Sequence, residues 1–243
     1  MLALTLMVGS AHAWVVKTNM AGEELGWEQS TIGYVLDPTG DHGLSTAGVE
    51  TAVTSAAVAW DRVPGVVISL EYDGRSATRE ASYEDDENLV YFEDDWDPQY
   101  DGLLAMTSVY SKTDTGEIVG FDIAVNLDYP WTTTGESDLY DLQNSLTHEF
   151  GHGLGLDHSA DGSATMFAST HKGETDKRTL EIDDEQGARY LYGEAGWVEP
   201  GTIACSATGT RSTGPSALFA AILSLALMRR RGGSDSSGDP VDA

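Results

Sequence analysis

The sequence has one cysteine, Cys205, few prolines and few basic residues. A single thiol cannot form an internal disulfide, so a disulfide-stabilised fold is excluded. The 13 lysines and arginines stand against 40 acidic residues, which gives a formal net charge of -27. Nucleic acids and anionic membrane surfaces repel such a chain, so we expect neither as a partner. The 243 residues, 40% of them hydrophobic, are enough for a globular domain with a sizeable core.

The amino-terminal end has the pattern of an export signal. Residues 2–9 are mostly apolar, and Ala11-His12-Ala13 follows as a small-x-small sequence. No basic residue precedes Lys17, which departs from the usual charged start of a signal peptide. We predict that residues 1–13 are a signal peptide cleaved after Ala13. The alternative is a buried amino-terminal strand.

The carboxy-terminal end, residues 199–243, has the pattern of a sorting tail. Cys205 lies among small and polar residues, an apolar run covers residues 217–228, and arginines occupy positions 229–231. The run is shorter than the roughly 20 residues of a membrane-spanning helix. The tail resembles the myxobacterial-type C-terminal sorting signal, which implies a short hydrophobic helix, secretion or cell-surface display, and a membrane tether. The alternative is a core or amphipathic helix with a free thiol.

Residues 14–198 read as one α+β domain. Val49, Val53, Ala56 and Trp60 recur at helical spacing, which predicts a helix over 45–62 that ends before Pro64. Strands are expected at 32–36, 66–72, 88–92, 103–110 and 118–125. Because these strands cluster instead of alternating with helices, we expect a mixed sheet.

Two further helices are expected in the second half of the chain. One begins near Ser137, a residue type that caps helices, and carries an apolar stripe that includes Leu146 and Phe150. The other covers about 180–192, with Gly193 as its stop.

The first of these helices contains the sequence His148-Glu149-Phe150-Gly151-His152-Gly153-Leu154-Gly155-Leu156-Asp157-His158. His148 and His152 are four residues apart, so both project from one helical face. That face is rotated away from the apolar stripe, which places the two imidazoles toward a cleft. Gly155 permits a sharp turn, after which His158 folds back as a third ligand.

Three neutral imidazoles with one open coordination position are a catalytic zinc arrangement. Zinc lowers the pKa of its bound water to about 7 and polarises a substrate carbonyl. Glu149 is placed to act as general base, taking the water proton and passing it to the leaving amine. Five fixed residues in this register make the pattern far more specific than a bare pair of histidines.

The string resembles that of the metzincins and, because Ser159 follows the last histidine, more closely that of the matrixins. The resemblance implies a zincin-like domain with a twisted mixed sheet, an active-site helix, a Met-turn and a carboxy-terminal helix. Residues 163–167 fit the Met-turn, with Met166 as its methionine, and Trp60 and residues 180–193 fit as well. The implied activity is zinc-dependent cleavage of protein or peptide substrates, which would add as an extended strand to the edge strand at 103–110.

Two departures from the family pattern change the expectations. No histidine lies between His42 and His148, so we expect no second, histidine-held zinc. The single cysteine lies downstream of the domain, so latency through a propeptide cysteine is not expected.

Calcium binding in the acidic loops at 94–101 and around Gly116 stays an open alternative. We expect a monomer. The alternatives in function are a non-catalytic zinc-binding surface or adhesion protein and a zinc hydrolase that acts on a substrate other than protein.

Overall fold

A computed structural model describes residues 12–40, 43–77, 81–82, 85 and 87–195, and the backbone of 219–222 and 241–242. Most of the predicted signal peptide, Cys205 and the arginine cluster therefore lie outside the described residues. The predicted tail helix does so too, apart from Phe219–Ile222, which form strand β11. Among the described helices, none combines the length and apolar composition needed to cross a membrane.

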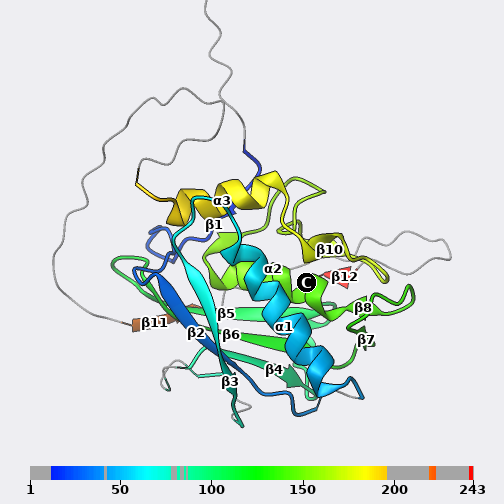
Figure 1. Ribbon diagram of the computed structural model, residues 1–243. Coiled ribbons are helices and arrows are strands. Elements are labelled where there is room, and N and C mark those ends of the chain that lie inside the picture. Colours follow the sequence, from blue (N-terminus) through cyan, green and yellow to red (C-terminus); the bar gives the residue numbers. More distant parts are fainter. Residues whose placement is uncertain are drawn as a thin grey trace, which may run out of the picture.

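The domain is built on one mixed sheet with the strand order β11-β5-β6-β4-β2-β3 (Figure 1). Neighbours among β2, β3, β4 and β6 are parallel, whereas β5 is antiparallel to β6 and β11 is antiparallel to β5. The helices lie on one side of the sheet in Figure 1. This arrangement confirms the expected α+β class. The strand bounds are β2 Thr31–Leu36, β3 Ser69–Arg75, β4 Leu89–Glu93, β5 Ala105–Lys112 and β6 Ile118–Asn126.

Helix α1, Thr46–Asp61, confirms the helix expected near 45–62. Ser45 caps it, because its hydroxyl accepts a hydrogen bond from the backbone N–H of Gly48 at 3.1 Å. The predicted apolar stripe is buried. At the end of the stripe, Trp60 Nε1 donates to the carbonyl of Thr147 at 2.8 Å. This bond fixes α1 against the helix that carries the histidines.

Helix α2 spans Leu142–Gly153, so the prediction that it begins near Ser137 is wrong. Its cap is Asp141, whose carboxylate accepts from the backbone N–H of Asn144 at 2.9 Å. Arg178 donates to both oxygens of the same carboxylate, at 2.8 and 2.5 Å. The long-range ion pair anchors Asp141, and this interaction is not visible in local sequence.

Other element bounds also differ from the prediction, and β5 lies two residues later than the strand expected at 103–110. The strand expected at 66–72 is β3, which is shifted toward the carboxy terminus because its pairing with β2 starts at Thr31 and Ser69. The last helix, α3, spans Ile182–Tyr192 and begins later than expected. Glu181 and Asp184 form a reciprocal capping box at its start, which defines the first turn.

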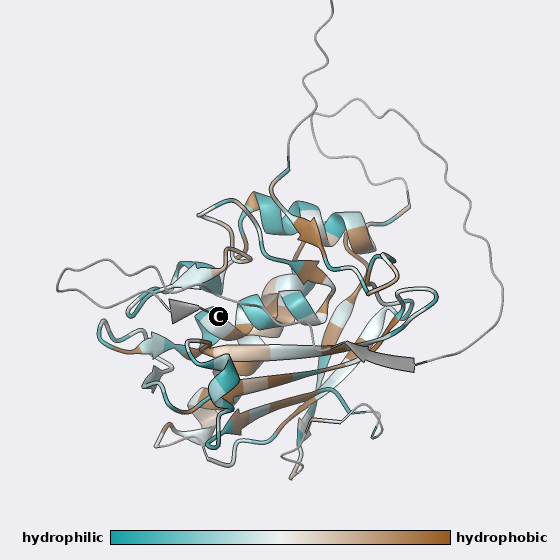
Figure 2. Ribbon diagram, turned by 180° about the vertical axis from the view of Figure 1, so that it is seen from behind, coloured by the Kyte–Doolittle hydropathy of each residue, from teal (hydrophilic) through white to brown (hydrophobic). Residues whose placement is uncertain are grey.

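The core lies between the sheet and the helices. Figure 2 shows hydrophobic colour along the strands and hydrophilic colour on much of α3. In β4, Val90 and Phe92 belong to the main cluster under the helices, whereas Leu89 and Tyr91 belong to a second cluster on the opposite face. The sheet is thus covered on both faces. The short elements are β1 Val15–Val16, η1 Pro98–Tyr100, β7 Trp131–Thr132, β8 Tyr140–Asp141, β9 Leu156–Asp157, β10 Ser169–Thr170, η2 Asp176–Arg178 and β12 Val241–Asp242.

Candidate functional site

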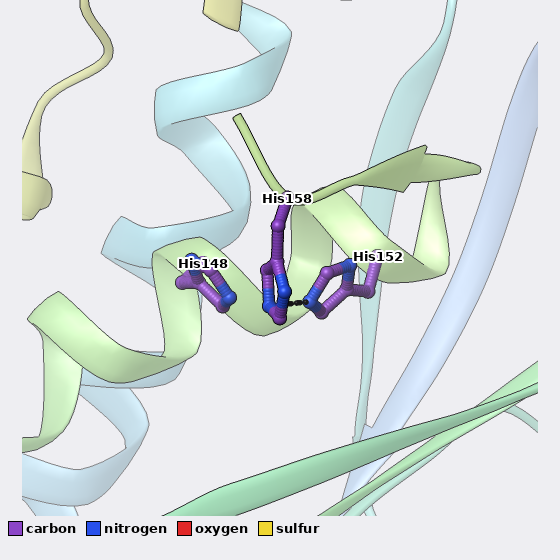
Figure 3. Close-up of side chains that lie close together, drawn as sticks. All are labelled: His148, His152 and His158. Atoms are coloured by element: carbon purple, nitrogen blue, oxygen red, sulfur yellow. Dashed lines mark hydrogen bonds between the residues drawn. The ribbon is translucent and has the colours of Figure 1, made fainter. Parts of the chain in front are cut away.

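His148, His152 and His158 converge (Figure 3). One nitrogen of each ring lies within 4.8 Å of the others. His148 and His152 come from consecutive turns of α2, and His158 comes from the segment after β9. His152 Nε2 and His158 Nε2 are 3.2 Å apart. Three ring nitrogens at such separations can share one metal ion.

Gly155 makes this convergence possible. Its φ is +98°, a conformation that other residues rarely adopt, and a Cβ at this position would lie 2.7 Å from the carbonyl oxygen of Leu25. The chain therefore reverses immediately after α2 and returns His158 to the other two histidines. This part of the sequence prediction is confirmed.

The backbone fixes the orientation of the two helical imidazoles. His148 Nδ1 lies 2.7 Å from the carbonyl of Thr165, and His152 Nδ1 lies 2.8 Å from the carbonyl of Leu156. A carbonyl can only accept, so each Nδ1 carries the proton and each Nε2 presents a lone pair. His148 Nε2 is buried and has no hydrogen-bond partner among the described residues. An unpartnered, buried lone pair fits a metal ligand.

Burial also keeps the imidazoles neutral, which is the form that binds metals. It lowers the pKa of His148 and of His152 well below the ordinary value. The pKa of His158 falls to about 4, mainly through burial, although the charge of Asp157 opposes the shift. All three rings are therefore available as ligands at neutral pH.

Glu149 lies beside the histidines and is fully buried. Its Oε2 accepts a hydrogen bond of 2.5 Å from the hydroxyl of Thr107 on β5, and its Oε1 has no partner among the described residues. Burial raises the pKa of Glu149 to about 7, and the hydrogen bond from Thr107 opposes this shift. One carboxylate oxygen is thus held while the other remains available to a proton donor.

The predicted Met-turn packs beneath the histidines. Met166 is 1% exposed, and a Cβ added to Gly151, between His148 and His152, would lie 2.3 Å from Met166 Sδ. The turn also closes onto the segment of the third histidine, because Ser159 N–H donates to the carbonyl of Met166 at 2.8 Å. The role of Met166 is therefore packing under the site.

Two consecutive carboxylates of α3 anchor the surrounding loops. Asp184 accepts from the backbone N–H groups of Thr165 and Met166 at 2.7 and 2.9 Å. Asp183 accepts from the N–H of Trp14 at 3.0 Å and from the hydroxyl of Ser159 at 2.6 Å. The last helix thus ties the Met-turn, the third-histidine segment and the amino-terminal segment together.

The site differs from the sequence prediction in its burial. His148 and His152 were expected to face a cleft, yet both are 0% exposed, and only His158 is partly exposed. The carbonyls that hold their Nδ1 atoms belong to the Met-turn and to β9, so both segments pack against the rings.

Sequence reasoning also missed three residues that act on Glu149. Thr107 contacts it directly, and the charges of Lys17 and Lys177 lower its pKa. These residues lie far from Glu149 in sequence, and no spacing pattern links them to it.

Among the described residues, the histidine triad is the only group of three or more His, Cys, Asp or Glu side chains arranged to hold a metal ion. The acidic loop at 94–101 includes η1, which Asp97 caps by accepting from the N–H of Gln99 at 2.9 Å. Calcium binding in this loop stays a prediction.

Comparison with known proteins gives a family match over most of the described domain. Residues 26–193 match the family model described as Matrixin. The chain is 31% identical over 172 residues to Matrix metalloproteinase-18 of Xenopus laevis, and 28% identical over 169 residues to Neutrophil collagenase of Homo sapiens. These alignments cover 70% and 69% of this chain but only 34% and 33% of the relatives, so the chain spans about a third of their length. A shorter alignment, 39% identical over 88 residues, covers 36% of this chain and 14% of Matrix metalloproteinase-16 of Rattus norvegicus.

Proposed function

Because this chain belongs to the matrixin family, we propose that it is a zinc-dependent endopeptidase. His148, His152 and His158 would hold the zinc ion, and Glu149 would act as the general base. The observation that carries the proposal is the convergence of three neutral imidazoles, with a buried lone pair on His148 Nε2, beside a carboxylate that has one unpartnered oxygen.

When bound, zinc would lower the pKa of a coordinated water molecule and polarise the substrate carbonyl. Glu149 takes the proton of the attacking water on Oε1 and passes it to the nitrogen of the departing amine. Thr107 holds Oε2 during both transfers, so the carboxylate keeps one orientation. The burial of Glu149 brings its pKa near 7, which suits a group that both accepts and donates a proton near neutral pH.

The proposed substrate is an extended segment of a protein or peptide. Apart from β11, which comes from residues 199–243, β5 is the outermost strand of the sheet, and it places Thr107 beside Glu149. An added strand would form main-chain hydrogen bonds along β5. The backbone of β11 pairs with this edge, which supports the ability of β5 to accept another strand.

The remaining proposals concern where the protein is located, its oligomeric state and its other ligands. We propose that residues 1–13 direct export and that residues 199–243 form a sorting tail that tethers the domain 14–198 to the cell surface or is removed on secretion. The domain would act as a monomer. Structural calcium in the acidic loops would accompany the catalytic zinc, and no nucleic acid would bind.

The test is made on the full chain with casein as substrate. The protein is stripped with a chelator and reloaded with zinc, and zinc content and casein cleavage are measured together. The proposal predicts about one zinc per chain, loss of zinc and cleavage in the chelated sample, and recovery of both on reloading. A variant with His148→Ala should lose both. A folded, zinc-loaded chain that cleaves neither casein nor a broad peptide library would favour the non-catalytic surface protein.

A further inference from the structure

Lys17 is a buried lysine next to the proposed active site. It is 5% exposed, and among the described residues the only other buried lysine or arginine is Lys177. Its backbone is fixed on both sides, because its N–H donates to the carbonyl of Gly155 at 2.8 Å and its carbonyl accepts from Leu25 N–H at 2.8 Å. The chain therefore holds Lys17 in place directly beside the turn that returns His158.

Within the described part of the chain, the ammonium group of Lys17 has no protein partner at hydrogen-bond distance and forms no ion pair. Lys177, in contrast, donates to the carbonyls of Phe167 and Ser169 at 2.5 and 3.0 Å. Although the side chain is mostly buried, Lys17 Nζ is not one of the fully buried atoms without a partner, so its tip reaches solvent and can accept a ligand carboxylate.

The charge of Lys17 is coupled to the pKa values of residues in the proposed active site. The carboxylates of Asp157 and Glu149 raise the pKa of Lys17, although burial lowers it more. Among neighbouring charges, Lys17 has the largest effect on the pKa of His152, whereas Lys177 has the largest effect on that of His148. The hydrogen bonds agree with this order, because Lys17 N–H donates to Gly155, next to β9, whereas Lys177 donates to Phe167 beside the Met-turn. Lys17 therefore lies on the side of His152 and Asp157.

This side corresponds to one end of the proposed substrate strand. Asn19, two residues after Lys17, donates through Nδ2 to the carbonyls of Lys112 and Thr113 at 3.4 and 2.9 Å, at the carboxy-terminal end of β5. β11 pairs antiparallel with β5. A peptide bound in this direction has its amino-terminal residues near Lys112 and runs past Thr107, so residues that precede the cleaved bond lie on the side of Lys17.

We propose that Lys17 binds an acidic side chain of the substrate on the amino-terminal side of the cleaved bond. The proposal rests on the proposed endopeptidase function and adds a substrate class to it: segments with Asp or Glu shortly before the cleavage site. A carboxylate would complete the charge-assisted hydrogen bond that Lys17 lacks in the protein. A positive group at this point also offsets the repulsion that a chain of net charge -27 exerts on acidic substrates.

The experiment uses the zinc-loaded full chain and quenched fluorescent peptides built on one casein cleavage site. Each peptide pair carries Glu or Gln at one of the three positions before the cleaved bond. At one position, the wild type should prefer Glu over Gln by about tenfold in kcat/KM, the contribution of one hydrogen bond to a charged group. Lys17→Met should bring this ratio to about one, and Lys17→Arg should retain it. Arg75→Met is the matched control, because it removes one positive charge from β3 with a side chain that is 52% exposed.

A second variant and a second readout keep the test decisive. Asp157→Asn removes the carboxylate that competes for Lys17 but keeps the oxygen that accepts from His158 N–H, so the preference for Glu should increase. Anisotropy measured on the zinc-loaded Glu149→Gln variant gives the same Glu-to-Gln ratio as a binding ratio, without cleavage. If the wild type cleaves no peptide, the endopeptidase proposal fails while this binding ratio still decides on Lys17.

The proposal is overturned if the wild type shows no Glu preference at any of the three positions, or if Lys17→Met leaves the ratio unchanged. It is also overturned if Lys17→Met lowers kcat equally for both members of a pair, since that result assigns Lys17 to the reacting carbonyl or to the fold.

Discussion

Thr107 Oγ1 donates to Glu149 Oε2 over 2.5 Å, across the packing interface between β5 and α2. The two residues are 42 positions apart in sequence. This bond links the edge strand that would hold the substrate to the group that would move the proton. It also opposes the effect of burial on the pKa of Glu149.

Replacing Thr107 with Val should lower kcat/KM by about tenfold, because Glu149 loses the donor that orients it. Removal of that donor raises the pKa of Glu149, so the acid limb of the pH profile should move to higher pH. Thr107→Ser keeps a hydroxyl and should keep both the rate and the limb. Identical pH profiles for the Val and Ser variants would contradict this role.

Gly151→Ala should destabilise the domain by about 2 kcal/mol, the cost of overpacking a filled core. The added Cβ would meet Met166 Sδ at 2.3 Å and Trp60 Cζ2 at 2.6 Å. Gly162→Ala is the control, since nothing lies within 4 Å of a Cβ there. Urea unfolding of the two variants measures the difference, and equal midpoints would show that the Met-turn is not packed against α2 as described.

Asp184→Asn should destabilise the domain by about 2 kcal/mol, because the amide cannot accept all three backbone hydrogen bonds that the carboxylate accepts. The donors are Thr165, Met166 and Glu181. Zinc affinity should fall as well, since Thr165 also orients His148. Asp161→Asn, at an exposed loop position, is the control for thermal unfolding and zinc titration. If the Asp184 variant is destabilised but keeps its zinc affinity, Asp184 anchors the loops without positioning the zinc ligands.

The stability should depend on the ionisation of Asp122, which is 2% exposed in β6. Burial raises its pKa from 3.8 to about 6. The folded state therefore holds a proton that the unfolded state releases. The resulting stabilisation is complete below pH 3.8 and is lost as the pH rises through 6, by about 2 to 3 kcal/mol in total.

Asp122→Asn should remove this dependence. Urea unfolding from pH 3.5 to 7 should show that the wild type loses stability relative to the variant as the pH rises through this range. A difference that is flat across the range, or that changes in the opposite direction, would show that the carboxyl group is not held in its protonated form.

Much of the fold could be predicted because its signals are local. Helix α1 is predicted from the spacing of the apolar residues on its buried face, Val49, Val53, Ala56 and Trp60. The spacing of His148 and His152 places both rings on one side of α2. Gly155 indicated the turn that returns His158, because few other residues adopt its backbone conformation. In each case, the residues that carry the signal are neighbours in the chain.

The sequence predictions are wrong or incomplete where residues distant in sequence determine an element's bounds or a site contact. Ser137 and Asp141 are both residue types that cap helices, and Arg178 anchors the one that does so. The start of β3 is fixed by its register with β2. Thr107, Lys17 and Lys177 reach Glu149 only after the sheet and helices pack, so no sequence pattern could assign them to the site.

The most direct measurement compares the zinc-loaded wild type with zinc-loaded Glu149→Gln by counting new α-amino groups released from casein. The variant keeps the three histidines and the size of the side chain but cannot accept the proton. Our account predicts that both proteins hold zinc at the same ratio and that the variant loses activity by a factor of about 100 or more, the contribution of a general base. Cleavage by the variant at the wild-type rate would contradict it.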